Sequence, residues 1–292
     1  MKNTFQNSFM SLWFNVKKKI RAKEFLSQMD NVIPYDRFMS IIWEKYNTEA
    51  KTWRPKYDLK LLLKIYFLQN FYNLWDLWME EAIYDRISFQ EFLWVDTLSN
   101  NIPDETTILN FRHLLEENKL QDVLFEEVLL LLKTKWFYFT RWTIVDATII
   151  KASSHTKNKE QKRDPEMSST KKNNNYYFWM KTHIWVDAES WIVHTVVSTT
   201  AKKSDIWETV NLLHWEEIAV FWDKAYTKKE DKQKARKEGI YYWMTSKWTK
   251  SKKLSTKQKK RNKHLSSVRS KVEHPFRILK CQFWFREVRY KW

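Results

Sequence analysis

The sequence is almost without glycine. It contains one, Gly239, in 292 residues, whereas average usage of about 7% predicts about 20. Tryptophan, normally the rarest residue, occurs 18 times, so the two residues together match the number expected for glycine alone. Trp191, Trp215 and Trp248 stand where turns are expected. An indole is out of place there, because turns favour positive φ and small polar residues.

We interpret many of these tryptophans as glycines read with the wrong genetic code, and UGA is the obvious codon. The alternative is a protein that is truly rich in tryptophan, but such enrichment does not by itself remove glycine. Misread glycines should lie at turns, at positive φ, or with the indole exposed. Trp179 and Trp185, on an expected strand, are the harder test, because each ring must project into solvent or push helices off the sheet.

Cysteine and long apolar runs are also scarce. Cys281 is the only cysteine, which excludes an internal disulfide, and the paired Cys or clustered His of a structural zinc site are missing. The best apolar run, residues 65–75, is about half of the roughly 20 residues that a membrane-spanning helix needs. The start of the chain shows no signal peptide. These absences predict a cytoplasmic protein without a membrane partner.

Acidic residues are few in the second half of the chain. The 52 Lys and Arg exceed the 35 Asp and Glu, which gives a net charge of +17. Residues 1–140 have a net charge of −1, so the excess positive charge lies in the rest of the chain. Residues 247–271 hold 11 Lys and Arg and no acid. A charge run of this kind is often a solvated tail, but here it leads into a patterned helix. We therefore favour contact with nucleic acid.

The period of the apolar residues changes near residue 140. Before it, long segments with apolar residues at a spacing of three to four predict helices. After it, β-branched runs predict strands, with residues 151–175 as a mobile loop and a hairpin near residue 190. The helices are expected at 17–31, 35–46, 57–72 and 120–135, and the order after residue 140 is strands 143–150, 176–187 and 191–200, helix 204–214, strand 218–222, helix 228–237, strand 240–244 and helix 266–280. This order predicts a helical N-terminal domain over 1–138 and a mixed-sheet domain over 139–292.

Three acids occupy places that structural acids avoid. Asp146 interrupts an apolar strand and Asp223 ends another, although a buried carboxylate is costly unless it is paired. Glu273 shares a helix face with Arg269, Arg277 and Lys280, which a ladder of salt bridges explains when that acid is taken alone. Taken together, the three acids lie on elements that can meet in one mixed sheet. Three converging carboxylates are what two Mg²⁺ ions about 3.5–4 Å apart require.

Several stretches around these acids follow one another along the chain: Val-Asp146-Ala-Thr-Ile-Ile, residues 156–167, residues 178–187, Asp223-Lys-Ala-Tyr226 and Val-Glu273-His-Pro-Phe-Arg. With residues 103–115 of the helical half, they resemble the bacterial insertion-sequence DDE transposases of the IS five family, which have a ribonuclease H-like catalytic core. The resemblance covers nearly the whole chain. It implies that Asp146, Asp223 and Glu273 are the catalytic acids and that they bind two Mg²⁺ or Mn²⁺ ions.

Some positions depart from the pattern of that family. Ser266 replaces the Tyr of a signature that continues through Arg269, Glu273 and Lys280, and Ala225 replaces a Gly. The chain stops where relatives continue, so we expect a truncation at the C-terminus. Tryptophan stands where the family has Gly at positions 142, 179, 185, 191, 215 and 284, which supports the recoding interpretation independently.

The resemblance implies cleavage at the ends of a mobile DNA element and transfer of the exposed 3′-hydroxyls to target DNA. DNA is then the partner, at least a homodimer is needed to pair two ends, and the expected location is the bacterial nucleoid. The helical domain is expected to recognise the ends or to mediate dimerisation. Two alternatives are a nuclease of the same fold that only hydrolyses and a non-catalytic DNA-binding derivative. The expected DNA contacts are Arg269, Arg277, Lys280, Lys257, Lys259, Lys260 and Arg261.

Overall fold

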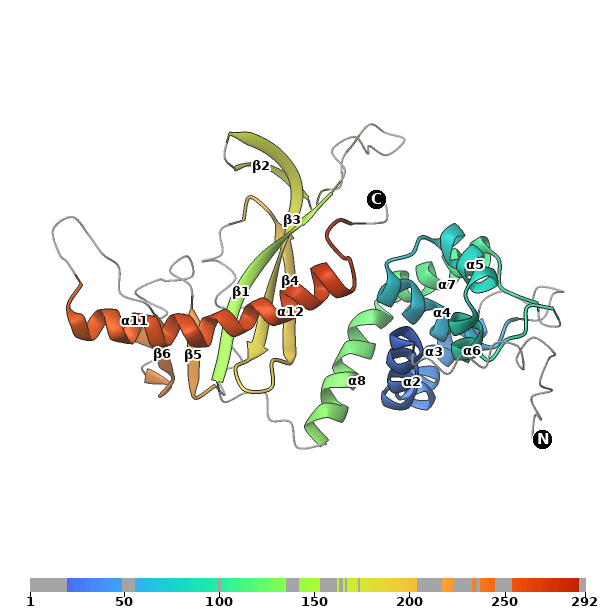
Figure 1. The fold of residues 1–292 in the computed structure, drawn as a ribbon, viewed down its shortest axis with the longest axis horizontal. Helices are drawn as coiled ribbons and strands as arrows, with labels where there is room; N and C mark the ends of the chain where they lie inside the picture. The colour runs from blue at the N-terminus through green and yellow to red at the C-terminus, as the bar shows by residue number, and fades with distance from the viewer. Residues whose placement is uncertain are drawn as a thin grey trace. The chain divides into compact units, whose positions relative to one another are not determined.

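The computed structural model divides into two compact units, residues 1–124 and 125–292, which are drawn in Figure 1. It describes residues 20–48, 56–98, 101–134, 142–152, 167–172, 174–203, 217–222, 237–244 and 254–288, with positions 162, 165, 233 and 234. The domain boundary predicted at residue 138 lies outside these residues. Among them, no helix has the length and apolar character needed to cross a membrane.

The first unit is helical, as the spacing of its apolar residues predicts. Asp58 and Asp104 cap two of its helices, because their side chains accept hydrogen bonds from the main-chain N–H groups of Lys60 and Thr107. The core includes Leu26, Leu68 and Met79 from three different helices. The helices are α2 (Arg21–Val32), α3 (Tyr35–Thr48), α4 (Leu59–Tyr72), α5 (Asp76–Asp85), α6 (Ile87–Leu93) and α7 (Glu105–Glu117), with α8 (Leu120–Thr134) running on into the second unit.

Two buried cations form ion pairs within this helical core. Arg112 pairs with Asp76 at 3.2 Å and with Glu116 at 2.9 Å. Lys64, whose side chain is only 3% exposed, lies 2.7 Å from Asp30. Burial lowers the pKa of Lys64, and the nearby carboxylate of Asp30 opposes that shift. Each of these cations is paired with a carboxylate of the same unit.

The second unit contains a six-stranded mixed sheet, as predicted. Its order is β2-β3-β1-β5-β6, and β4 also pairs with β3. The strands β1, β2, β3 and β4 form antiparallel pairs, whereas β5 runs parallel to both β1 and β6. Their bounds are β1 (Trp142–Lys151), β2 (Ser168–Lys172), β3 (Asn175–Asp187), β4 (Val193–Thr200), β5 (Ala219–Trp222) and β6 (Tyr241–Met244).

A long helical segment near the C-terminus packs across one face of this sheet (Figure 1). Leu265, Val272 and Phe276 contact the face formed by Ile144 and Phe221 with their neighbours. The segment begins with a capping box at Ser255. It consists of α11 (Thr256–Arg269), a 3₁₀ turn η2 (Ser270–Val272), α12 (Glu273–Arg277) and a π-helical turn η3 (Ile278–Gln282).

The structure corrects two predictions in this unit. The expected loop 151–175 contains the strand β2, which pairs with the first residues of β3. The last helix begins at Thr256 and not at residue 266, because the capping box at Ser255 starts it. The apolar pattern does not reveal this start, since Leu265 is the only buried residue of α11. The predicted helices 204–214 and 228–237 lie outside the described residues, apart from three positions of the second.

Tryptophan occupies backbone positions that favour glycine. Among the described residues, six other than glycine have positive φ, and three of these are Trp94, Trp191 and Trp284, at 58°, 61° and 55°. Trp94 follows the end of α6, where the N–H of Val95 bonds back to the carbonyl of Gln90 as in a glycine-capped helix. The three indoles are 67%, 46% and 60% exposed. These sites match the interpretation of misread glycines, whereas Trp215 and Trp248 lie outside the described residues.

Trp179 and Trp185 are both buried, so the first of the two outcomes expected for them, a ring that projects into solvent, is wrong. Trp185 is fully buried beside Val145 and Trp222 on the sheet face opposite the C-terminal helical segment. Trp179 is 6% exposed and stacks on Tyr177 with the ring centres 4.6 Å apart. The described tryptophans with exposed indoles are Trp43, Trp75, Trp78, Trp94, Trp142, Trp191, Trp243 and Trp284.

Candidate functional site

The alternation of side chains along β1 places Asp146 on the helix-covered face of the sheet. Ile144 packs against the C-terminal helical segment, and every second residue of a strand points to the same side. Asp146 and Thr148 therefore point toward that segment. The Asp146 carboxylate accepts a hydrogen bond from the main-chain N–H of Ala147 at 2.8 Å, which fixes its direction at the edge of a pocket.

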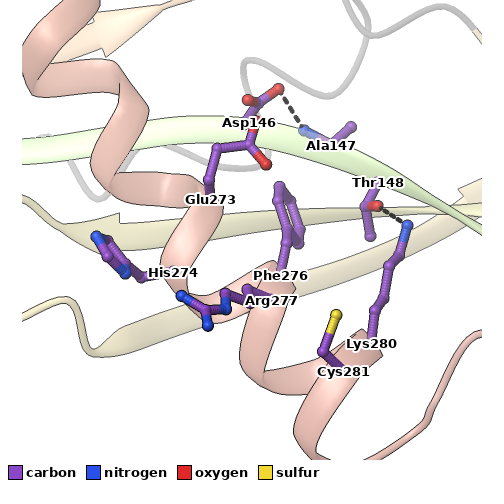
Figure 2. A pocket seen from close by; sticks show the side chains of 9 residues that line it. All are labelled: Asp146, Ala147, Thr148, Glu273, His274, Phe276, Arg277, Lys280 and Cys281. Atoms are coloured by element: carbon purple, nitrogen blue, oxygen red, sulfur yellow. Dashed lines mark hydrogen bonds between the residues drawn. The ribbon is translucent and has the colours of Figure 1, made fainter.

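The pocket lies between β1 and the C-terminal helical segment and has a volume of about 550 Å³ (Figure 2). Asp146 enters it from the strand and Glu273 from the first residue of α12. These two acids are 127 residues apart in the chain. Two of the three predicted acids thus line one pocket. The complete lining is Asp146, Ala147, Thr148, Glu273, His274, Phe276, Arg277, Lys280 and Cys281.

Three predicted cations lie at or beside this pocket. The Arg269 guanidinium is 3.9 Å from the Asp146 carboxylate, and about a fifth of each side chain is exposed. Arg277 lines the pocket and is exposed. Lys280 also lines it, but its ammonium group donates hydrogen bonds to the Thr148 hydroxyl and, at 3.0 Å, to a main-chain carbonyl of β1. Positively charged side chains therefore lie at or beside the pocket of the two carboxylates.

Asp223 lies outside the described residues. The strand that leads to it, β5, ends at Trp222 and pairs in parallel with β1 from Trp142 through Ile144, two residues before Asp146. The described residues contain no group of three or more His, Cys, Asp and Glu side chains that could hold a metal ion. The two acids that they do bring together offer hard oxygen donors at an open pocket, which suits Mg²⁺ or Mn²⁺.

The predicted basic run forms most of α11. Lys257, Lys259 and Lys260 are exposed on this helix, and Ser255 caps its beginning. Arg261 is exposed as well, but its guanidinium lies over the Trp243 ring of β6, 5.6 Å from the ring centre. The cations of α11 thus form an ordered cationic surface on the same helical segment that carries Glu273.

Sequence reasoning missed several residues that line or support the pocket. His274 lines it next to Glu273, and its ring stacks flat on Trp191 at 4.4 Å. Thr148 could have been found from its position two residues after Asp146 on the same strand face. Lys271, which donates to the Ala188 carbonyl at 2.9 Å, gives no sequence signal because its acceptor is 83 residues away.

Comparison with known families agrees with this geometry. Residues 14–114 match the family described as Transposase domain (DUF772), and residues 138–291 match the family described as Transposase DDE domain. The second match covers more than half of the chain. A helical region followed by a mixed sheet is the ribonuclease H-like architecture of the DDE transposases. The chain belongs to the transposase DDE domain family, and DNA is its partner.

Proposed function

We propose that this protein is an insertion-sequence transposase of the IS five branch that cleaves the ends of a DNA element and joins them to target DNA. One observation carries the proposal: Asp146 on the first strand and Glu273 on the last helical segment line one pocket in a cationic frame. Asp223 is proposed as the third acid, supported by the parallel pairing of β5 with β1 just before that residue in the chain.

We propose that Asp146, Asp223 and Glu273 hold two divalent cations, Mg²⁺ or Mn²⁺. Such ions, when bound, supply activation of the attacking oxygen and stabilisation of the leaving 3′ oxygen. Arg277 is exposed in the pocket and can orient a phosphate group through its fork of N–H donors. Arg269, which faces Asp146, balances the negative charge of the carboxylates.

Both proposed reactions are displacements at phosphorus. In the first, a water oxygen bonds to the phosphorus at the element end, the bond from phosphorus to the 3′ oxygen breaks, and that oxygen takes up a proton. The products are a free 3′-hydroxyl and a 5′-phosphate. In the second, this 3′-hydroxyl loses its proton as its oxygen bonds to a target phosphorus, and the target 3′ oxygen leaves. No net oxidant or reductant is required.

We further propose that the two parts of the chain have different functions. Residues 139–292 form the catalytic domain, and residues 1–138 recognise the element ends or mediate dimerisation. The charge balance supports the placement of the catalytic domain, since all of the excess positive charge lies beyond residue 140. Pairing two ends in one complex requires at least a dimer.

The proposal is tested with DNA taken from the flanks of the gene, where inverted repeats define the element ends. Purified protein should cut a labelled end in Mg²⁺ or Mn²⁺ and should lose that activity when the ion is chelated. It should also join a pre-cut end with a free 3′-hydroxyl to a target plasmid. Cutting without joining would identify a hydrolytic nuclease, and binding without either reaction would identify a non-catalytic derivative.

The basic surface of α11 should make DNA binding strongly dependent on salt. Each phosphate that Lys or Arg neutralises contributes about −0.9 to the slope of log affinity against log salt concentration. Changing Lys257, Lys259, Lys260 and Arg261 together to Gln should therefore flatten the slope by about 3 to 4. Fluorescence anisotropy at a series of salt concentrations measures it, with little preference for sequence.

A matched variant that changes the same three lysines to Arg keeps the charge and should keep the slope of the wild-type protein. If the Gln variant has an unchanged slope, α11 does not contact phosphates and its basic residues are a solvated surface.

A further inference from the structure

Lys280 has a different environment from the other cations of the pocket. Its side chain is partly buried, and its ammonium group donates to the Thr148 hydroxyl and to the Ile149 carbonyl. We propose that Lys280 is a positioning residue that sets Glu273 against Asp146 by joining the helical segment of one acid to the strand of the other. This inference rests on the proposed function of the two acids.

The geometry of the contact supports this role. Thr148 lies two residues after Asp146 and on the same face of β1, and Lys280 lies seven residues after Glu273. One side chain therefore connects the two walls of the pocket (Figure 2). Thr148 is only 8% exposed, so water competes little for this hydrogen bond.

The local backbone of the helical segment also favours this contact. Residues Ile278–Gln282 form a π-helical turn, and such turns are rare and occur often at functional sites. The wider turn changes the direction of Lys280 relative to a regular α-helix that begins at Glu273. The sequence predicts that Glu273, Arg277 and Lys280 share one helix face. In the structure Arg277 is exposed in the pocket, whereas Lys280 reaches β1.

The chain after Lys280 strengthens the same junction. Arg286 donates a side-chain hydrogen bond to the Lys280 carbonyl at 2.8 Å. The main chain of Arg286 and Val288 pairs with both main-chain groups of Lys151 at the end of β1, at 3.2 and 2.8 Å. At the other end of the segment, Lys271 donates to the Ala188 carbonyl in the turn after β3. The helical segment is thus held on both sides of Glu273.

A positioning role predicts a loss of metal affinity without a loss of phosphate contacts. Mn²⁺ is titrated into complexes of the protein with a pre-cut DNA end, and free Mn²⁺ is measured by electron paramagnetic resonance. Lys280→Met and Thr148→Val should each weaken Mn²⁺ binding about tenfold, the usual size of such supporting contacts. The double variant should be no weaker than the singles, because both remove one interaction. Thr148→Ser keeps the hydroxyl and is the matched control.

Arg277→Gln provides the opposite pattern. It should reduce the slope of log DNA affinity against log salt concentration by about 0.9 while Mn²⁺ binding stays at the wild-type level. Thr148→Val should leave that slope unchanged, because it removes no cation. Melting temperatures of all variants show whether each one is folded, and Thr148→Val tests the junction without altering any charge.

Two results would overturn the inference. One is wild-type Mn²⁺ affinity in Lys280→Met, and the other is wild-type affinity in Thr148→Val. If Asp146→Asn and Glu273→Gln complexes also bind Mn²⁺ as tightly as wild type, the failure belongs to the proposed function, because the acids then hold no metal. If those two variants lose Mn²⁺ and the Lys280 and Thr148 variants do not, the positioning role alone is wrong.

Discussion

Replacement of Asp146 by Asn should abolish DNA cleavage and strand transfer while DNA binding changes little. The amide keeps the shape of the carboxylate but removes the charge that a divalent cation needs. A metal ion contributes several kcal/mol to the stabilisation of the transition state, so the rate should fall about a thousandfold or more. Single-turnover cleavage of a labelled end and joining of a pre-cut end measure the rates, and a gel-shift titration measures binding.

Glu273→Gln and Asp223→Asn should behave in the same way. The second of these variants tests an acid that lies outside the described residues. Glu287→Gln is the matched control, since Glu287 is an exposed acid on the segment that pairs with β1 and does not line the pocket. An Asp146→Asn protein that still cuts DNA would refute the assignment of the site.

Glycine at positions 94, 191 and 284 should stabilise the protein. The left-handed backbone conformation costs a residue with a side chain roughly 1–2 kcal/mol, and glycine adopts it freely. Trp94→Gly and Trp284→Gly should each gain about 1 kcal/mol, because both indoles are largely exposed. Trp191→Gly should gain less, since it also loses the stack on His274. Thermal and urea unfolding measure the three changes.

Trp185→Gly should have the opposite sign in the same experiments. This ring is fully buried, and removing such a side chain costs about 3–5 kcal/mol. The gain expected at the turns and the loss expected at position 185 therefore have opposite signs, and unfolding of a version with glycine at all 18 positions measures their balance. Peptide mass spectrometry of the natural protein decides the matter: peptides with Trp at positions 179, 185 and 191 would refute the recoding interpretation.

The sequence was sufficient to predict the elements whose residues repeat in a regular period. The strand of Asp146 and the hairpin that turns near residue 190 follow from runs of β-branched residues, and the structure confirms the antiparallel pairing of the hairpin. The early start of α11 was missed because Leu265 is its only buried residue. An apolar period is therefore nearly absent there, and the helix is set by the capping box at Ser255.

The candidate site could be predicted only as a set of acids and cations. Asp146 stands out because a charge is unusual on an apolar strand, Glu273 stands out because it is an acid among cations, and the structure brings both to one pocket. The contact between Lys280 and Thr148 joins residues 132 positions apart. No local pattern encodes such a pair, because its geometry depends on the packing of the helical segment on the sheet.

The placement of Glu273 has a consequence for protein synthesis. Asp146 lies on the first strand of the sheet, whereas Glu273 belongs to the last helical segment and is translated 127 residues later. At about 5–20 residues per second, this separation lasts roughly 6–25 s on the ribosome. Every nascent chain that ends between residues 146 and 272 contains Asp146 without Glu273, which lines the pocket from the helical segment. An unfinished chain would therefore be unable to cut DNA.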